Sequence, residues 1–166
     1  MATLTDGRNA VWNAINNAAT LLDNGTSVFK KQIKFNNEEP LINQATIEES
    51  LCFADLPCMA IWNQSMSMEW FRNTDQEWLN TLLVTFWTPT HALPDAEDWA
   101  EKIIVAIFET LPSGNSSPAT YVRLASASIP RIGSVTFDPV DIGGENTIKS
   151  VRTTIAVTLR FLKSIC

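Results

Sequence analysis

The sequence has very few of the residues that catalytic and metal sites use most. Its 166 residues include one histidine, His91, and three cysteines, Cys52, Cys58 and Cys166. A Ser-His-Asp or Cys-His site would need His91, which lies between two prolines in a segment that we expect to be an exposed loop. The cysteines have no spacing typical of a metal site, and their odd number favours reduced, unpaired thiols. We therefore predict no enzyme activity, no cofactor and no bound metal.

Long apolar runs are also absent. The longest unbroken run extends from Ile103 to Phe108, whereas crossing a bilayer takes roughly 20 apolar residues. The first residues lack the basic and apolar regions of a signal peptide. We therefore expect a protein that is made in the cytoplasm and has no membrane association.

Basic residues are outnumbered by acidic ones. The formal net charge is −6 and the pI is about 4.7, which argues against a protein that binds by neutralising phosphates. One basic cluster alternates with apolar residues and so resembles a nucleic-acid-binding face. We interpret it instead as a strand with a buried apolar face and solvated lysines that protect a sheet edge. The cluster consists of Phe29, Lys30, Lys31, Ile33, Lys34 and Phe35.

Two pairs of adjacent acids could suggest general acid and base catalysis. They are Glu48 with Glu49 and Glu97 with Asp98. Each pair falls where we expect a helix to begin, the first one in a Thr46-Ile47-Glu48-Glu49 capping box. Capping and the helix dipole therefore explain both pairs without catalysis.

Two long amphipathic helices are predicted. The first begins at Thr5 or Asp6 and ends at Asn24-Gly25, and the second runs from Pro94 to Leu111 with acids in its first turn. Apolar residues at helical spacing form one stripe on each: Val11, Ile15, Ala18 and Leu22 on the first, and Ala96, Ala100, Ile103, Ile107 and Leu111 on the second.

Period-two alternation predicts several strands. The clearest runs from Val151 to Phe161, where every second residue belongs to one largely apolar face. A hairpin is predicted between Met66 and Phe86, with a turn near Thr74 that would set Trp70 opposite Trp78. With 166 residues we expect one α/β domain spanning residues 1–166. Its predicted class is α+β, with a mainly antiparallel sheet and the two long helices packed on one side.

Six tryptophans are many for this length. Most are expected in the core, but a strand with Trp78 and Trp87 on its two faces is difficult to bury in a monomer. Because tryptophan is enriched at interfaces, this pattern indicates subunit contacts.

The order of these elements resembles the tail terminator proteins of long-tailed bacteriophages. The resemblance covers roughly Thr5 to Leu162. It is carried by a first amphipathic helix, a Leu-Pro before a short apolar strand, a hairpin, a strand ending in Thr-Pro, an acidic-start helix and the last strand. The corresponding residues are Leu56–Trp62, Thr88-Pro89, Pro94–Leu111 and the final Thr-Thr-Ile-Ala-Val-Thr-Leu-Arg-Phe sequence.

The resemblance implies a structural virion protein, a hexameric ring in the tail or neck that is made in the host cytoplasm. Such a ring ends tube growth at the head-proximal end, contacts the tube protein and head-completion or neck proteins, and lets DNA pass through its lumen without specific binding. We place the subunit contacts at Trp70, Arg72, Trp78, Arg152 and Arg160, the arginines facing carboxylates of a neighbouring copy.

Three alternatives remain open at this point. The first is another neck or head-completion ring. The second is a monomeric protein-binding module that presents Trp70 and Phe71, and the third is an enzyme with an unrecognised site. The fold alone does not distinguish between them.

Overall fold

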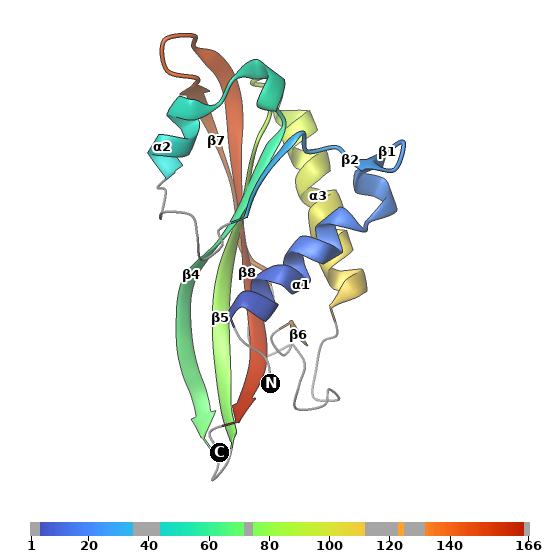
Figure 1. Cartoon of the computed structure of the whole chain (residues 1–166), viewed down its shortest axis with the longest axis vertical. Coiled ribbons are helices and arrows are strands. Elements are labelled where there is room, and N and C mark those ends of the chain that lie inside the picture. Colours follow the sequence, from blue (N-terminus) through green and yellow to red (C-terminus); the bar gives the residue numbers. More distant parts are fainter. Residues whose placement is uncertain (1–3, 35–43, 72–74, 112–122, 125–131, 165–166) are drawn as a thin grey trace.

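The computed structural model describes residues 4–34, 44–71, 75–111, 123–124 and 132–164 (Figure 1). These residues form three α-helices, a six-stranded sheet and a two-stranded hairpin, so the predicted α+β class is confirmed. The helices are α1 (Leu4–Asn16), α2 (Gln44–Ser50) and α3 (Leu93–Thr110). The small hairpin pairs β1 (Leu22–Asp23) with β2 (Thr26–Ser27). The large sheet contains β3 (Lys31–Lys34), β4 (Cys58–Phe71), β5 (Asp75–Trp87), β6 (Arg123–Leu124), β7 (Ile132–Ile142) and β8 (Ile148–Ser164).

The large sheet is mixed. Its order is β3-β4-β5-β8, and β7 and β6 pair one after the other with the remaining edge of β8. The pairs β4-β5, β5-β8, β7-β8 and β6-β8 are antiparallel, whereas β3 is parallel to β4. The prediction of a mainly antiparallel sheet therefore fits in part, since it did not include the parallel strand β3. Its parallel orientation follows from the connection through α2, which returns the chain to the end of the sheet where β3 began.

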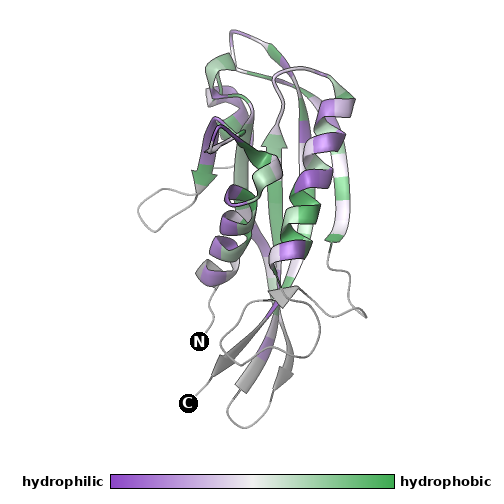
Figure 2. Ribbon diagram, turned by 90° about the vertical axis from the view of Figure 1, so that its right-hand side faces the viewer, coloured by the Kyte–Doolittle hydropathy of each residue, from purple (hydrophilic) through white to green (hydrophobic). Residues whose placement is uncertain are grey.

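Helices α1 and α3 pack side by side on one face of the sheet (Figures 1 and 2). Their apolar stripes meet every second residue of β5 and β8 in the main core. The fully buried residues of this core include Val11, Ile15, Ile103, Ile107, Leu82, Val84, Phe86, Ile155, Val157 and Leu159. The predicted alternation in the last strand is confirmed where its side chains are described, from Val151 to Arg160.

Helix α2 lies on the face of the sheet opposite α1 and α3. A short helix was predicted here, but its position on that face was not. Ile47 and Leu51 pack there against Cys58, Ala60 and Trp87, which alternate with the main-core residues of β4 and β5. The helix begins at Gln44, so the proposed capping box at Thr46 is wrong. Glu48 lies within the helix and has a different role, described below.

The first helix ends earlier than predicted. It stops at Asn16, and Leu22 belongs to β1. Asn24 and Gly25 both have positive φ, at 51° and 79°, and form the tight turn between β1 and β2. An Asn-Gly pair with two positive φ angles is the preferred two-residue hairpin turn, and this competing use explains the error.

A three-stranded ribbon projects beyond the helices (Figure 1). It consists of Ser65–Phe71, Asp75–Leu79 and Arg160–Ser164, which continue β4, β5 and β8. The predicted hairpin is thereby confirmed, although its turn at 72–74 lies outside the described residues. Its predicted register is wrong, because Trp70 is opposite Glu77 and Trp78 is opposite Met68. Phe71 is already opposite Gln76, one residue from the predicted pairing, and a register shift between Met68 and Trp70 adds a second residue of offset farther along the strands.

Candidate subunit interface

The ribbon is a candidate contact surface, because it projects from the body and one of its strand edges is open in the part of the chain that the structure describes (Figure 1). Met66, on its β4 strand, is 42% exposed, and Trp78 and Leu79 are half-buried. Beside it, β3 pairs with β4 only from Cys58 to Ile61. Among the described residues, the outer edge of β4 therefore has no strand partner beyond that point. Unpaired strand edges and exposed apolar side chains are typical of contact surfaces.

The base of the ribbon is fixed by an ion pair. Arg160 Nη1 donates to Glu77 Oε1 at 2.9 Å, and the two side chains are only 14% and 16% exposed. Both residues lie on the sheet face opposite α1 and α3. A partly buried pair of this kind is costly to break, because one charge would be left without its partner. The guanidinium that we expected to face a neighbour's carboxylate thus already has a carboxylate in its own chain.

Arg152 lies at the other end of β8, beneath α2. Its Nη1 is 2.7 Å from Glu48 Oε1, and the same oxygen accepts a hydrogen bond from Trp87 Nε1 at 3.0 Å. Its Nη2 is 3.7 Å from Asp138 Oδ2. This arrangement, here called the Glu48 node, ties α2 to β5, β7 and β8. Pairing an acid with an indole and a guanidinium explains Glu48 better than helix capping does.

The five predicted interface residues do not form one surface. Trp78 and Arg160 lie at the ribbon, where the backbone of Trp70 also lies. Arg152 is eight positions before Arg160 on the same strand, roughly 26 Å away. Arg72 and the side chain of Trp70 lie outside the described residues. An interface role for all five stays a prediction, and the structure places Trp78 and Arg160 at the ribbon and Arg152 in the Glu48 node.

Sequence reasoning missed Asn80, a fully buried side chain in β5 where the ribbon begins. Its Nδ2 donates to Asn63 Oδ1 at 3.1 Å and to Ser65 O at 3.0 Å. The sequence feature that could have identified Asn80 is its amide, which lies between Trp78 and Leu82 on a strand face that is otherwise apolar.

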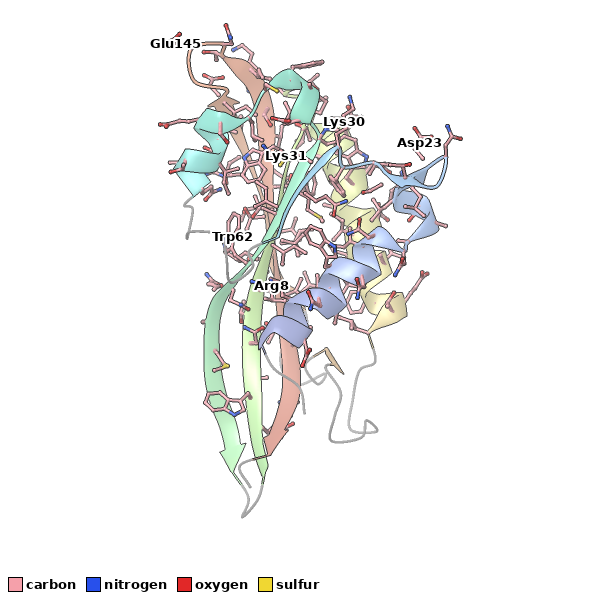
Figure 3. All side chains as sticks on the ribbon, viewed as in Figure 1. Arg8, Asp23, Lys30, Lys31, Trp62 and Glu145 are labelled. Carbon is pink, nitrogen blue, oxygen red and sulfur yellow. The ribbon has the colours of Figure 1, made fainter. Side chains whose placement is uncertain are left out.

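The end of the molecule opposite the ribbon has a different surface. An open pocket of about 610 Å³ lies between the segment after α2 and the β7-β8 turn, near Glu145 (Figure 3). Phe53 lines it and is 63% exposed. The turn depends on Gly143, where φ is 90° and a Cβ would lie 2.6 Å from a backbone oxygen. The two ends therefore offer different chemistry to a partner.

The structure shows the surroundings of the residues that were weighed for catalysis, where those residues are described. His91 is exposed, as expected, with Nε2 3.3 Å from Val140 O. Burial raises the pKa of Cys58 to about 12, so it stays a thiol. Cys52 is exposed and its Sγ donates to Asp55 Oδ2 at 3.3 Å. No group of metal-ligating side chains occurs among the described residues, and Cys166 lies outside them.

The basic cluster matches the expectation only in part, because Phe29 and Ile33 do not share a face: Ile33 of β3 packs against the core under α2, on the opposite side of the sheet from Phe29. Phe29 is buried in the main core, where its ring lies 5.8 Å from that of Phe86. Lys30 is exposed and Lys31 is half-buried, with Nζ 3.7 Å from Asp55 Oδ2 (Figure 3). The strand β3 lies at the edge of the sheet, so the lysines border that edge. This placement favours edge protection over nucleic-acid binding.

Comparison with known proteins does not identify a relative. The sequence matches no protein-family model, and no curated protein matches it. Within the described residues, no helix is both long enough and apolar enough to cross a membrane. We therefore infer the function from the geometry of the ribbon and of the opposite end of the molecule.

Proposed function

We propose that this protein is a tail terminator of a long-tailed bacteriophage. In this proposal a hexameric ring of the protein binds the head-proximal end of the tail tube, stops its growth and joins the tail to the head. The protein would be a structural component of the virion, with the tube protein and head-completion or neck proteins as partners. It would have no enzymatic activity, and its α+β domain would supply the ring's wall.

The projecting ribbon is the observation that best supports a ring. A closed ring of identical subunits needs heterologous contacts, in which one surface of each copy meets a different surface of the next. A ribbon that leaves the body beyond α1 and α3 can reach a neighbouring copy while its own body stays intact. Its exposed Met66 and its tryptophans supply the apolar contact that such an interface requires.

The two unlike ends of the molecule suit a ring that ends a tube. One face of a terminator must meet the tube and the other must meet head or neck proteins. The ribbon and the Phe53 pocket lie at opposite ends of the long axis (Figures 1 and 3). The ribbon can thus contact the neighbouring copy while the opposite end, with the pocket, stays open to a tube or head partner.

The negative net charge of the protein is compatible with the passage of DNA through such a ring. The net charge of −6 gives no strong attraction to phosphates. A lumen with few unpaired cations would let DNA slide without being retained. Arg152 and Arg160 are neutralised within the chain by Glu48 and Glu77, which is consistent with this requirement.

Within this proposal the five interface residues have two functions. Trp70, Arg72 and Trp78 on the hairpin contact the neighbouring copy directly. Arg160 holds the ribbon through Glu77, and Arg152 holds α2 through the Glu48 node. Tryptophan anchors in a desolvated contact commonly contribute most of an interface's free energy, so the tryptophans are the residues to change first.

Assembled particles provide the direct test, because free subunits that closed into rings before reaching the tube could not be templated by it. Cryo-EM of tails should show six copies at the head-proximal end. Trp70→Ser should prevent incorporation, whereas Val105→Ser, which alters an exposed apolar residue on α3, should not. Six copies in the neck above the tube would support the alternative neck or head-completion ring. Absence from the particle would leave the monomeric binding module.

A further inference from the structure

The ribbon leaves the body at an irregularity in β4. Asn63 pairs with Leu82 and Ser65 pairs with Thr81, so Gln64 is an extra residue on β4. A bulge of this kind bends its strand and increases the local twist. The bulge lies level with Asn80 and Leu159, the last fully buried residues of β5 and β8 before the ribbon. The direction of the ribbon is therefore set at this level.

One side chain spans the bulge. Asn80 Nδ2 donates to Asn63 Oδ1 at 3.1 Å and to Ser65 O at 3.0 Å, so a single amide holds the residues on both sides of Gln64. Asn63 and Ser65 are exposed, whereas Asn80 is fully buried. The bulge is thus fastened from the inside of the protein and not from its surface.

The first turn of α1 closes over this site. A Cβ on Gly7 would lie 3.3 Å from Leu159 Cδ1 and 3.5 Å from Asn80 Oδ1, so glycine allows the helix to approach closely. Arg8 follows it on α1 at the level where the ribbon begins (Figure 3). Asn80 consequently has little room to adopt another position, and its two hydrogen bonds are held in place by packing.

Burying an amide in an otherwise apolar face costs free energy unless its hydrogen bonds are made. Asn80 Nδ2 makes two bonds, whereas its buried Oδ1 has no partner among the described residues, so the position is costly and the two Nδ2 bonds offset only part of that cost. Leucine would suit the same position by pattern, since Leu82, Val84 and Phe86 follow on that face. We propose that Asn80 is a positioning residue that fixes the direction of the ribbon by fastening both sides of the β4 bulge. The fixed ribbon is thereby pre-oriented for the neighbouring copy, a consequence that rests on the proposed function.

The positioning role is tested on the isolated full chain by spin-label distances between ribbon and body. Labels at Ser67→Cys and Val105→Cys, with Cys52 and Cys166 replaced by serine, report the direction of the ribbon; Cys58 is buried and remains. We expect one narrow distance distribution for this labelled parent. Asn80→Leu keeps the volume but removes both donated bonds, so it should broaden or shift the distribution.

Thr85→Val is the matched control. Thr85 is also fully buried in β5, its hydroxyl has no partner among the described residues, and it is remote from the bulge. It should leave the distribution unchanged. Asn63→Ala is a second test at an exposed position, which removes one of the two bonds and should broaden the distribution less than Asn80→Leu does. Unchanged distributions in both Asn80→Leu and Asn63→Ala would overturn the positioning role, and Asn63→Ala decides the matter if Asn80→Leu does not fold.

Incorporation into tails tests the consequence for assembly. At a temperature where all variants are folded, Asn80→Leu should lower incorporation by about tenfold or more, while Thr85→Val should not. A tenfold loss corresponds to about 1.4 kcal/mol of binding free energy. Normal incorporation of a variant whose ribbon-to-body distance distribution is broadened would show that a fixed ribbon direction is not needed for assembly. If the unmodified protein formed no ring in tails, the proposed function would fail, yet the spin-label distances would still decide the role of Asn80.

Discussion

The Glu48 node gives a prediction that is independent of function. Glu48 Oε1 accepts from Arg152 at 2.7 Å and from Trp87 at 3.0 Å, and these bonds join α2 to the sheet. Replacing Glu48 with alanine leaves a guanidinium and an indole N–H without their acceptor. Both donors lie at the edge of the second core, around Ile47 and Leu51, so α2 should detach more easily from that core.

The expected size follows from the number of bonds and from exposure. A hydrogen bond to a charged group contributes about 1.5–3 kcal/mol, and breaking a fully buried pair costs about 3–5 kcal/mol. The side chains of Arg152 and Glu48 are 25% and 16% exposed, so water partly compensates for the loss. We therefore expect Glu48→Ala to lower the free energy of unfolding by about 2–3 kcal/mol. For a domain of this size that corresponds to a fall in Tm of about 4–12 °C.

Chemical denaturation with a double-mutant cycle provides the assay. Glu48→Ala, Arg152→Ala and the double variant should give a coupling energy of about 1–2 kcal/mol. Glu49→Ala is the matched control, since Glu49 is the exposed neighbour on the same helix, and it should change stability by less than about 0.5 kcal/mol. Equal effects of Glu48→Ala and Glu49→Ala, with no coupling to Arg152, would refute the node.

Three further predictions concern the core, the thiols and one acid. Val157→Asp should abolish cooperative melting, because it places an unpaired charge in the main core, and a soluble variant that melts cooperatively would contradict the fold. Peptide mapping after alkylation at pH 8 should show Cys52 modified in the folded protein and Cys58 modified only after denaturation. The hydrogen bond from the backbone N–H of Cys52, helped by Lys31, lowers the pKa of Asp55 below 3.8. Ionised Asp55 therefore stabilises the fold fully above pH 3.8, and this stabilisation is lost as the pH falls through the lower folded-state pKa. Asp55→Asn should consequently cost more stability at pH 6 than at pH 2, and an equal cost at both pH values would contradict this linkage.

Periodic patterns predicted the elements that bury one face. The stripe from Ala96 to Leu111 gave α3, and the alternation after Val151 gave β8, because burial on one side imposes a period of 3.6 or 2. Such patterns do not show which strands pair with each other, or in which direction. The parallel pairing of β3 depends on how α2 crosses the sheet, which no local period records.

Local ambiguity explains the remaining errors. The Asn24-Gly25 pair is compatible with both a helix end and a tight hairpin turn, and in the folded protein it forms the hairpin turn. The strands pair one residue away from the predicted register at Phe71 and Trp70, and a bulge between Met68 and Trp70 adds a second residue of offset beyond it; bulges leave no reliable mark in the sequence.

At the candidate interface, the sequence located the tryptophan hairpin, which the structure extends into a projecting ribbon. The carboxylate partners of the two arginines could not be predicted. Glu48 is 104 positions from Arg152, and Glu77 is 83 positions from Arg160. Only the folded chain brings these residues together, and it divides the predicted contact residues between the two ends of β8.

The central claim is that this protein ends the growth of a phage tail tube. The most direct measurement is the distribution of tail lengths, by electron microscopy, in a phage whose gene for this protein has been deleted. We predict tails of uncontrolled length that fail to join heads, with control restored by the unmodified gene and by the gene carrying Val105→Ser. Tails of normal length in the absence of the protein would contradict the account, whatever oligomer the protein forms in solution.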